Sequence, residues 1–142
     1  MKLTTYTDYS LRVLMYLGIH RDEAVTMSQI SESFGISHSH IMKVVHELGQ
    51  LGYLHTTRGK NGGIQLGRKP EDINLGALVR DTEKNLELVE CMGPNNQCKI
   101  TPACELKPIV SKALGAFLAV LDEYTLVDLI KPEKELKASL IS

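Results

Sequence analysis

Two short segments with helical periodicity, residues 27–34 and 38–50, are separated by only three residues, and this spacing constrains the fold more than any other feature. Thr26 is a suitable N-cap for the first segment, and Gly35 is suited to end it because glycine readily adopts left-handed backbone conformations. Ser37 is a suitable N-cap for the second segment. The inward-facing apolar positions of that segment recur every three or four residues and are Ile41, Val44, Val45 and Leu48. The spacing predicts a helix-turn-helix.

A short basic hairpin is predicted directly after these helices. Residues 53–57 and 64–66 are rich in β-prone side chains, and the connection between them includes Asn61-Gly62. An Asn-Gly pair favours a tight hairpin turn. A helix-turn-helix followed by a basic hairpin describes a winged helix. The predicted fold class is therefore mainly α with one small β-hairpin.

The predicted winged helix supplies candidate residues for DNA binding. Outward positions at the start of the second helix could reach base edges in a major groove, while cations of the hairpin lie along the phosphate backbone. The candidates are Ser28, Ser37, His38, Ser39, His40, Lys43, Arg58, Lys60 and Asn61. Three of them have a second interpretation, because Ser28 could be an additional helix cap and both histidines could be ordinary surface side chains.

The distribution of charge agrees with a DNA-binding N-terminal half. Residues 1–69 contain eight Lys and Arg against five acids, whereas residues 70–142 contain eight against twelve. No acid occurs between Gln50 and Pro70, so the cations of this stretch, which include Arg68 and Lys69, are candidate phosphate contacts. A solvated basic surface without a partner would show the same pattern of charge.

Helical periodicity predicts four further helices. They cover residues from about 9 to 20, 74–82, about 105–123, and 125–130. Thr7 or Asp8 is expected to cap the first of these. Residues 133–142 mix Lys and Glu and are expected to form a solvated tail.

The helix at 105–123 carries an apolar stripe wider than a small winged domain could cover. The stripe consists of Leu106, Ile109, Val110, Ala113, Leu114, Phe117, Leu118 and Leu121. The expected partner is the same helix of a second copy, and the resulting homodimer would match a palindromic DNA site. The alternative is packing within one chain.

The three cysteines of the chain, Cys91, Cys98 and Cys104, fall within fourteen residues that are rich in Gly, Pro and Asn. Thiols on one short loop can converge on one point, as a soft metal centre requires. An odd number of cysteines argues against a disulfide framework and for metal or redox chemistry. A zinc site and a metal-free thiol switch remain alternatives, although the gaps of six and five residues differ from the Cys-x-x-Cys spacing common in zinc sites.

The sequence argues against several other classes of protein. It contains no run of about 18 apolar residues, and its N-terminus lacks an apolar signal core, so we expect a cytoplasmic protein. It also lacks a phosphate-binding loop, a catalytic-triad pattern and regular α/β alternation, so we do not expect an enzyme. An electron-transfer protein would leave the helix-turn-helix and the wing without a purpose.

Several segments, in this order and spacing, resemble a known family. Thr-Asp-Tyr-Ser-Leu-Arg at 7–12, Arg-Gly-Lys-Asn-Gly-Gly-Ile at 58–64 and the three-cysteine loop are similar to segments of the bacterial winged-helix regulators that include the iron-sulfur regulator IscR. Residues 100–104 and 118–126 resemble the nitric-oxide-sensing repressors within that family. The similarity covers nearly the whole chain.

The resemblance implies a homodimeric repressor whose iron-sulfur cluster permits tight operator binding and whose reaction with nitric oxide releases the DNA. Cys91, Cys98 and Cys104 would be cluster ligands, and Asp8 is the candidate for a fourth ligand, from the same or the other subunit. We favour a [4Fe-4S] over a [2Fe-2S] cluster, although the cysteine spacing does not choose between them.

Asp8 and Arg12 are four residues apart on one expected helix, where a carboxylate and a cation can pair. We hypothesise that Asp8 exchanges between iron and Arg12 and so acts as a switch. The alternative is that Asp8 only caps the helix and always pairs with Arg12. The expected parts of the chain are a DNA-binding domain at 1–83, a cluster-binding loop at 84–104, and a dimerisation helix with its tail at 105–142.

Overall fold

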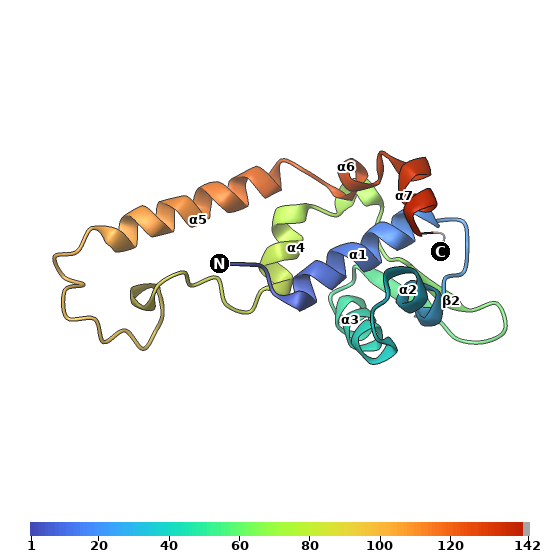
Figure 1. Cartoon of the computed structure of the whole chain (residues 1–142), viewed down its shortest axis with the longest axis horizontal. Helices are drawn as coiled ribbons and strands as arrows, with labels where there is room; N and C mark the ends of the chain where they lie inside the picture. Colours follow the sequence, from blue (N-terminus) through green and yellow to red (C-terminus); the bar gives the residue numbers. More distant parts are fainter. Residues whose placement is uncertain (141–142) are drawn as a thin grey trace.

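The computed structural model describes residues 1–140 and confirms a mainly helical fold with one β-hairpin (Figure 1). The helices are α1 (Thr5–Ile19), α2 (Met27–Phe34), α3 (His38–Gln50), α4 (Leu75–Thr82), α5 (Leu106–Asp122), α6 (Leu126–Ile130) and α7 (Glu133–Leu140). The strands are β1 (Leu54–Thr57) and β2 (Gly63–Leu66), and the short 3-10 turns are η1 (Pro70–Asp72) and η2 (Glu90–Met92). Within residues 1–140, no helix is long and apolar enough to cross a membrane.

The helix-turn-helix forms as the capping residues predict. Thr26 and Gln29 make a reciprocal capping box at the start of α2, and Gly35 ends that helix with a φ of 65°. The Ser37 hydroxyl accepts a hydrogen bond of 3.3 Å from the backbone N–H of His40 and so caps α3. Local side chains therefore fix the turn between the two helices.

The start of α1 differs from the prediction. Thr4, rather than Thr7 or Asp8, is the N-cap, and its hydroxyl accepts a hydrogen bond of 3.3 Å from the backbone N–H of Thr7. Thr7 is fully buried inside the helix. Asp8 therefore lies in the first turn, where a negative charge favours a helix N-terminus without capping it.

The wing is an antiparallel hairpin in which Leu54 pairs with Leu66 and Thr57 pairs with Gly63. The predicted Asn-Gly turn is wrong in detail, because Gly59 has a φ of 104° while Asn61 keeps a negative φ. Gly62 is required for a different reason: a Cβ atom there would collide with the backbone of Thr57 and Arg58. Arg58–Gly62 thus forms a longer loop than a two-residue turn.

The hydrophobic core lies among α1, α2, α3, the hairpin and α6. Its largest fully buried side chains include Leu14, Leu17, Ile30, Ile41 and Leu48. The backbone of Val25 joins the edge of β2 through a hydrogen bond of 2.7 Å from the Ile64 N–H. These contacts hold the helix-turn-helix and the wing as one unit.

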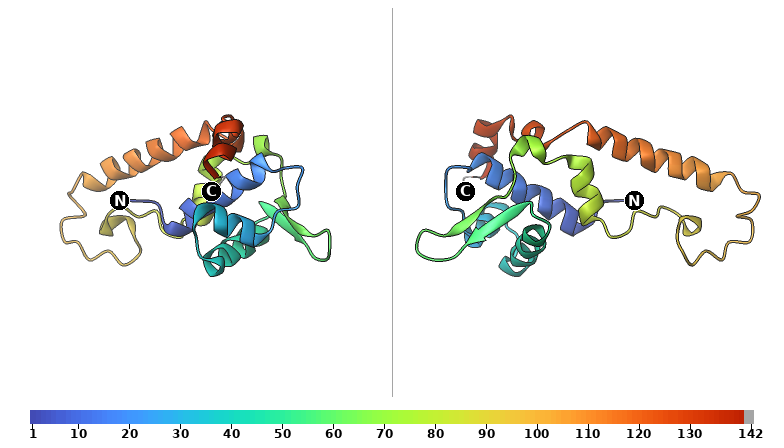
Figure 2. Two further views of the ribbon diagram at one scale, coloured as in Figure 1. Left: turned by 45° about the vertical axis from the view of Figure 1, so that its right-hand side comes forward. Right: turned by 180° about the vertical axis from the view of Figure 1, so that it is seen from behind.

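Helix α5 projects away from this unit as an arm, with the cysteine loop at its far end and the wing at the opposite end of the molecule (Figures 1 and 2). Its C-terminal end is fastened to α4. The Leu75 N–H donates to the Tyr124 carbonyl at 3.0 Å, and Arg80 forms a bidentate ion pair with Asp122 at 2.6 and 2.9 Å. Helix α5 begins at Leu106, so Pro108 falls in its first turn, where proline is tolerated.

Packing within one chain does not cover the apolar stripe of α5. Only Leu118 is buried, while Leu106, Ile109 and Phe117 are 48%, 63% and 38% exposed. Packing within this chain therefore covers only part of the stripe in the residues described.

The expected solvated tail is also wrong for residues 133–140, which form helix α7. Leu136 and Leu140 are partly buried and pack against the core cluster. Residues 141 and 142 of that expected tail lie outside the described residues.

Candidate functional site

The first turns of α3 present a polar surface. The polar residues Ser37, His38, Ser39, His40 and Lys43 are all exposed, whereas the predicted inward-facing positions of α3 are buried. The His40 ring lies edge-on to the ring of Tyr9 of α1, with 5.9 Å between the ring centres. Sequence reasoning missed this contact, since the two residues are 31 positions apart in the printed sequence. The N-terminal part of α3 is thus free to meet a ligand while α1 supports it.

Ser28 lies exposed in the first turn of α2. Thr26 and Gln29 already cap this helix end, so the Ser28 hydroxyl is not used as its cap. It lies in a helix that packs on α3.

The wing carries its free cations at its tip. Arg58, Lys60 and Asn61 are exposed in the loop between β1 and β2. Arg68 has a structural role instead: it donates to the Leu51 carbonyl at 2.8 Å, and its guanidinium carbon lies 4.1 Å from the Tyr53 ring centre. The exposed cations of the wing tip are therefore available for phosphate contact, whereas Arg68 is already engaged.

A depression of about 460 Å³ lies between α3 and β1. It is lined by His46 and His55 from the two elements, together with Met27 and Met42. His55 has no local signal in the sequence, because its nearness to α3 depends on the fold.

Asp8 and Arg12 form an ion pair along α1, with 3.0 Å between Arg12 Nη2 and Asp8 Oδ2. Both side chains remain about half exposed, at 50% and 41%. The Arg12 guanidinium also lies 5.5 Å from the centre of the Tyr9 ring. The structure therefore brings the two residues of the predicted switch together, in their paired arrangement.

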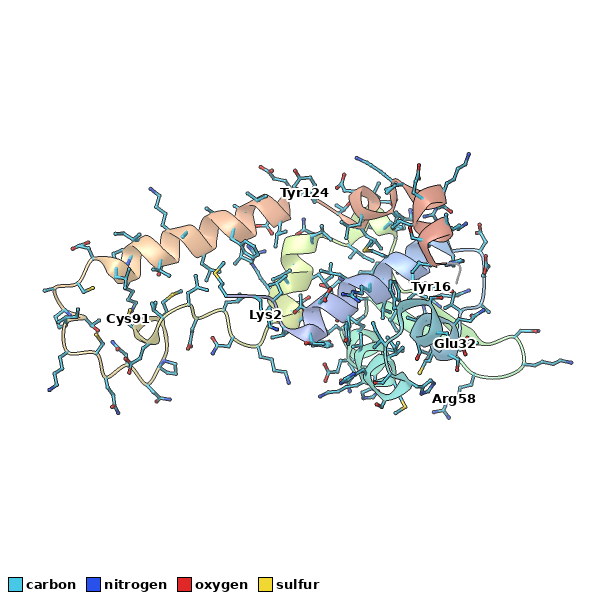
Figure 3. All side chains as sticks on the ribbon, in the orientation of Figure 1. Lys2, Tyr16, Glu32, Arg58, Cys91 and Tyr124 are labelled. Atoms are coloured by element: carbon cyan, nitrogen blue, oxygen red, sulfur yellow. The ribbon has the colours of Figure 1, made fainter. Side chains whose placement is uncertain are left out.

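The three cysteines line one cavity of about 140 Å³ at the far end of the arm. Figure 3 labels Cys91 in the loop below α5, well away from Lys2 at the start of the chain. The rest of the lining is mixed, with apolar Val89, Ile100 and Leu106 beside polar Glu90, Thr101 and Lys107. All three thiols are free.

Hydrogen bonds within the loop hold the cysteines near the cavity. The Cys98 N–H donates to Asn96 Oδ1 at 3.0 Å, and Thr101 Oγ1 donates to the Cys98 carbonyl at 2.9 Å. The Cys104 sulfur accepts a bond of 3.4 Å from the Leu106 N–H at the start of α5.

The donor set of this cavity fits a soft metal or an iron-sulfur cluster, since thiols are the ligands that such centres use. Within residues 1–140, no group of three His, Cys, Asp or Glu side chains is already gathered at metal-ligand spacing. Asp8 does not line this cavity. The chain thus brings three candidate ligands to one cavity and leaves a fourth to come from elsewhere.

Comparison with known proteins places this arrangement in a family. Residues 3–132 match the Rrf2 family, whose members are described as iron-dependent transcriptional regulators. The chain belongs to the Rrf2 family. Because the match covers both the winged helix and the cysteine loop, the predicted fold and the absence of an enzymatic role are both confirmed at the family level.

Two curated Rrf2-type relatives are similar over almost their whole length. The chain is 54% identical to the HTH-type transcriptional regulator NsrR of Bacillus subtilis over 138 residues, covering 96% of this chain and 94% of that protein. It is 51% identical to NsrR of Bacillus licheniformis over 142 residues, covering 99% of each. The resemblance noted from the sequence is therefore confirmed.

The fold is shared with a solved structure, T. potens IscR. The TM-score is 0.76 at 26% identity, with 95% of this chain and 90% of the other covered. The winged helix and the long projecting helix are thus features of the Rrf2 fold.

Proposed function

We propose that this Rrf2 regulator is a nitric-oxide-responsive transcriptional repressor. In this proposal a homodimer binds operator DNA when the cysteine cavity holds an iron-sulfur cluster, and nitric oxide lowers the affinity for DNA. The relatives named NsrR and the description of the family as iron-dependent support the proposal. The observation that carries it is that all three cysteines of the chain line one cavity.

Cys91, Cys98 and Cys104 would hold the cluster, for which we favour the [4Fe-4S] form. When bound, the cluster would supply iron sites that react with nitric oxide. Val89, Ile100 and Leu106 would provide apolar surface beside the cluster, over which a small uncharged molecule can approach.

The fourth ligand in this proposal is Asp8. Since Asp8 does not line the cavity of its own chain, we assign this role to the partner subunit's Asp8. A carboxylate is a harder and weaker ligand for iron than a thiolate, so Asp8 would be the most easily displaced of the four ligands. The ion pair with Arg12 is the state of Asp8 when it is not bound to iron.

DNA binding is assigned to the exposed residues of α3 and to the wing tip. Ser37, His38, Ser39, His40 and Lys43 would enter a major groove, while Arg58, Lys60 and Asn61 would contact the adjacent backbone. Ser28 would donate to a phosphate from the neighbouring helix. Every one of these side chains is exposed, as DNA contact requires.

The uncovered stripe of α5 supports the homodimer. Leu106, Ile109 and Phe117 of this stripe are exposed on a helix that projects from the rest of the chain. Burial of apolar surface against a second α5 would be favourable by about 25 cal/mol per Å². The proposed parts of the chain are thus DNA binding at 1–83, cluster binding at 84–104 and dimerisation at 105–142.

The test is purification without oxygen, followed by visible spectroscopy, iron and sulfide analysis, and operator binding before and after nitric oxide. A brown protein whose DNA affinity falls as its visible absorption bleaches supports the proposal. A colourless protein that contains zinc or no metal, and whose DNA affinity does not change with nitric oxide, overturns the sensing mechanism. Redox-dependent binding without any metal would point to a thiol switch.

A further inference from the structure

The carboxylate of Glu83 is buried, and it is satisfied by hydroxyl and amide donors instead of a cation. The residue is 8% exposed. Its oxygens accept hydrogen bonds from the Thr4 N–H at 3.1 and 3.2 Å, from the Thr7 hydroxyl at 2.6 Å, and from the Thr4 hydroxyl. No Lys or Arg within residues 1–140 forms an ion pair with it. Burial of a carboxylate without a counter-ion is costly, so such a group calls for an explanation.

Glu83 lies at a boundary between two functional parts. It directly follows α4 and is the last residue before the segment that leads to the cysteines. Beside it, the Thr82 and Thr7 hydroxyls are hydrogen-bonded at 2.9 Å. The junction of α4 and the cysteine loop is therefore held against the first turn of α1. Figure 1 shows the C-terminal end of α4 beside the N-terminal end of α1.

The first two turns of α1 continue this connection to α3. Tyr9 contacts the His40 ring. Tyr6 also lines one pocket together with Glu47 of α3. Asp8 lies in the same stretch of α1. A displacement of Glu83 would thus act on Asp8 and on the recognition helix through one short segment.

We propose that Glu83 is a positioning residue that couples the cysteine loop to the recognition helix by holding the first turn of α1. This inference rests on the proposed function, because it concerns how the state of the cysteine site reaches the DNA-binding surface. The coupling runs from Glu83 to Thr4 and Thr7, and from there through Tyr6 and Tyr9 to α3.

The test compares Glu83→Gln and Thr7→Val with two controls. Thr7→Ser keeps the hydroxyl that donates to Glu83, and Glu135→Gln removes the same charge from an exposed position on α7. The first readout is hydrogen exchange of the Asp8 amide, which donates to the Thr4 carbonyl at 3.0 Å. The second is the ratio of operator affinities of the protein with and without its cluster.

We expect Asp8 amide exchange to be about tenfold faster in Glu83→Gln and Thr7→Val, as the loss of a hydrogen bond to a charged group implies. We also expect the affinity ratio to approach one in these two variants, and both readouts to remain near wild type in the controls. An affinity ratio unchanged in both test variants would show that Glu83 is only structural and would overturn the inference.

Failure of the proposed function can be distinguished from failure of the inference about Glu83. In that case wild-type protein would show no dependence of DNA affinity on a cluster. The exchange comparison between Thr7→Val and Thr7→Ser needs no cluster, so equal Asp8 exchange in these two variants would overturn the inference independently. If Glu83→Gln fails to fold, the Thr7 pair still decides the outcome.

Discussion

Neighbours that lie far away in the sequence shift the pKa of individual side chains in this Rrf2 regulator. Tyr53 is buried, and its hydroxyl donates to Asp81 at 2.5 Å. Its pKa is raised to about 12, first by burial and then by this hydrogen bond and the charge of Asp81. Arg68 lies over the same ring and opposes the shift. The folded protein therefore favours the neutral phenol.

Tyr53→Phe should lower stability at neutral pH by about 1 kcal/mol, because the hydrogen bond to Asp81 is lost. A raised folded-state pKa contributes stability that is complete below pH 10, the ordinary value, and disappears as pH rises through about 12. The difference from wild type should therefore shrink in that range. Urea unfolding at several pH values measures this difference in the free energy of unfolding. Tyr124→Phe, at an exposed position, is the control. A difference that persists unchanged at high pH would contradict the prediction.

The cations at the wing tip offer a second prediction at this scale. Removing Arg58 and Lys60 together should weaken operator binding and reduce the dependence of log K on log salt by about 0.9 for each lost phosphate contact. The matched control removes Lys134 and Lys137 from α7, which leaves the wing intact. Titrations at several salt concentrations provide the slopes. Equal slopes in wild type and the wing variant would place the phosphate contacts elsewhere.

The helices and the hairpin differ in how far their sequences alone predict them. Capping residues predict α2 and α3 because a Thr, a Gly and a Ser fix their ends locally. Helix α7 was not predicted, since only Leu136 and Leu140 are apolar among many charges and its stability comes from packing on the core. The shared cavity of the cysteines was predictable from their spacing. The Glu83 bonds to Thr4 and Thr7 were not, because 76 or more positions separate the partners.

The exposed stripe of α5 leads to a prediction about assembly. Ile109→Glu should convert the proposed dimer to a monomer, since a charge would be buried in an apolar interface. The fold of each chain should persist, because this side chain is 63% exposed. Sedimentation equilibrium measures the change, and Glu135→Lys on α7 is a charge-changing control. A variant that remains dimeric would exclude this face of α5 as the interface.

The molecule as a whole separates its stable core from its cysteine cavity. The core lies in the winged helix and α6, while the cavity lies at the end of the arm (Figures 1 and 2). This layout allows the chemistry at the cysteines to change without unfolding the DNA-binding surface. The proposed sensing function would also require a physical connection between the cysteine cavity and the DNA-binding surface.

Iron removal with a chelator should therefore leave the helical circular dichroism and the main urea transition nearly unchanged, because the core contains no cysteine. Operator affinity should fall in the same sample. Circular dichroism and fluorescence-based DNA titration before and after chelation provide the comparison. Global unfolding on chelation would instead indicate that metal binding and folding are linked throughout the chain.

The fastening of α5 to α4 has a geometric consequence for DNA recognition. Arg80 and Asp122 clamp the base of the arm, and a side chain at Gly76 would collide with the Asp122 carboxylate. In a dimer joined through α5, the angle between α4 and α5 sets the distance between the two recognition helices. Two half-sites on one face of B-DNA lie about 34 Å apart, one helical turn. The angle between α4 and α5 would thus determine which half-site spacing an operator must have for the dimer to bind it.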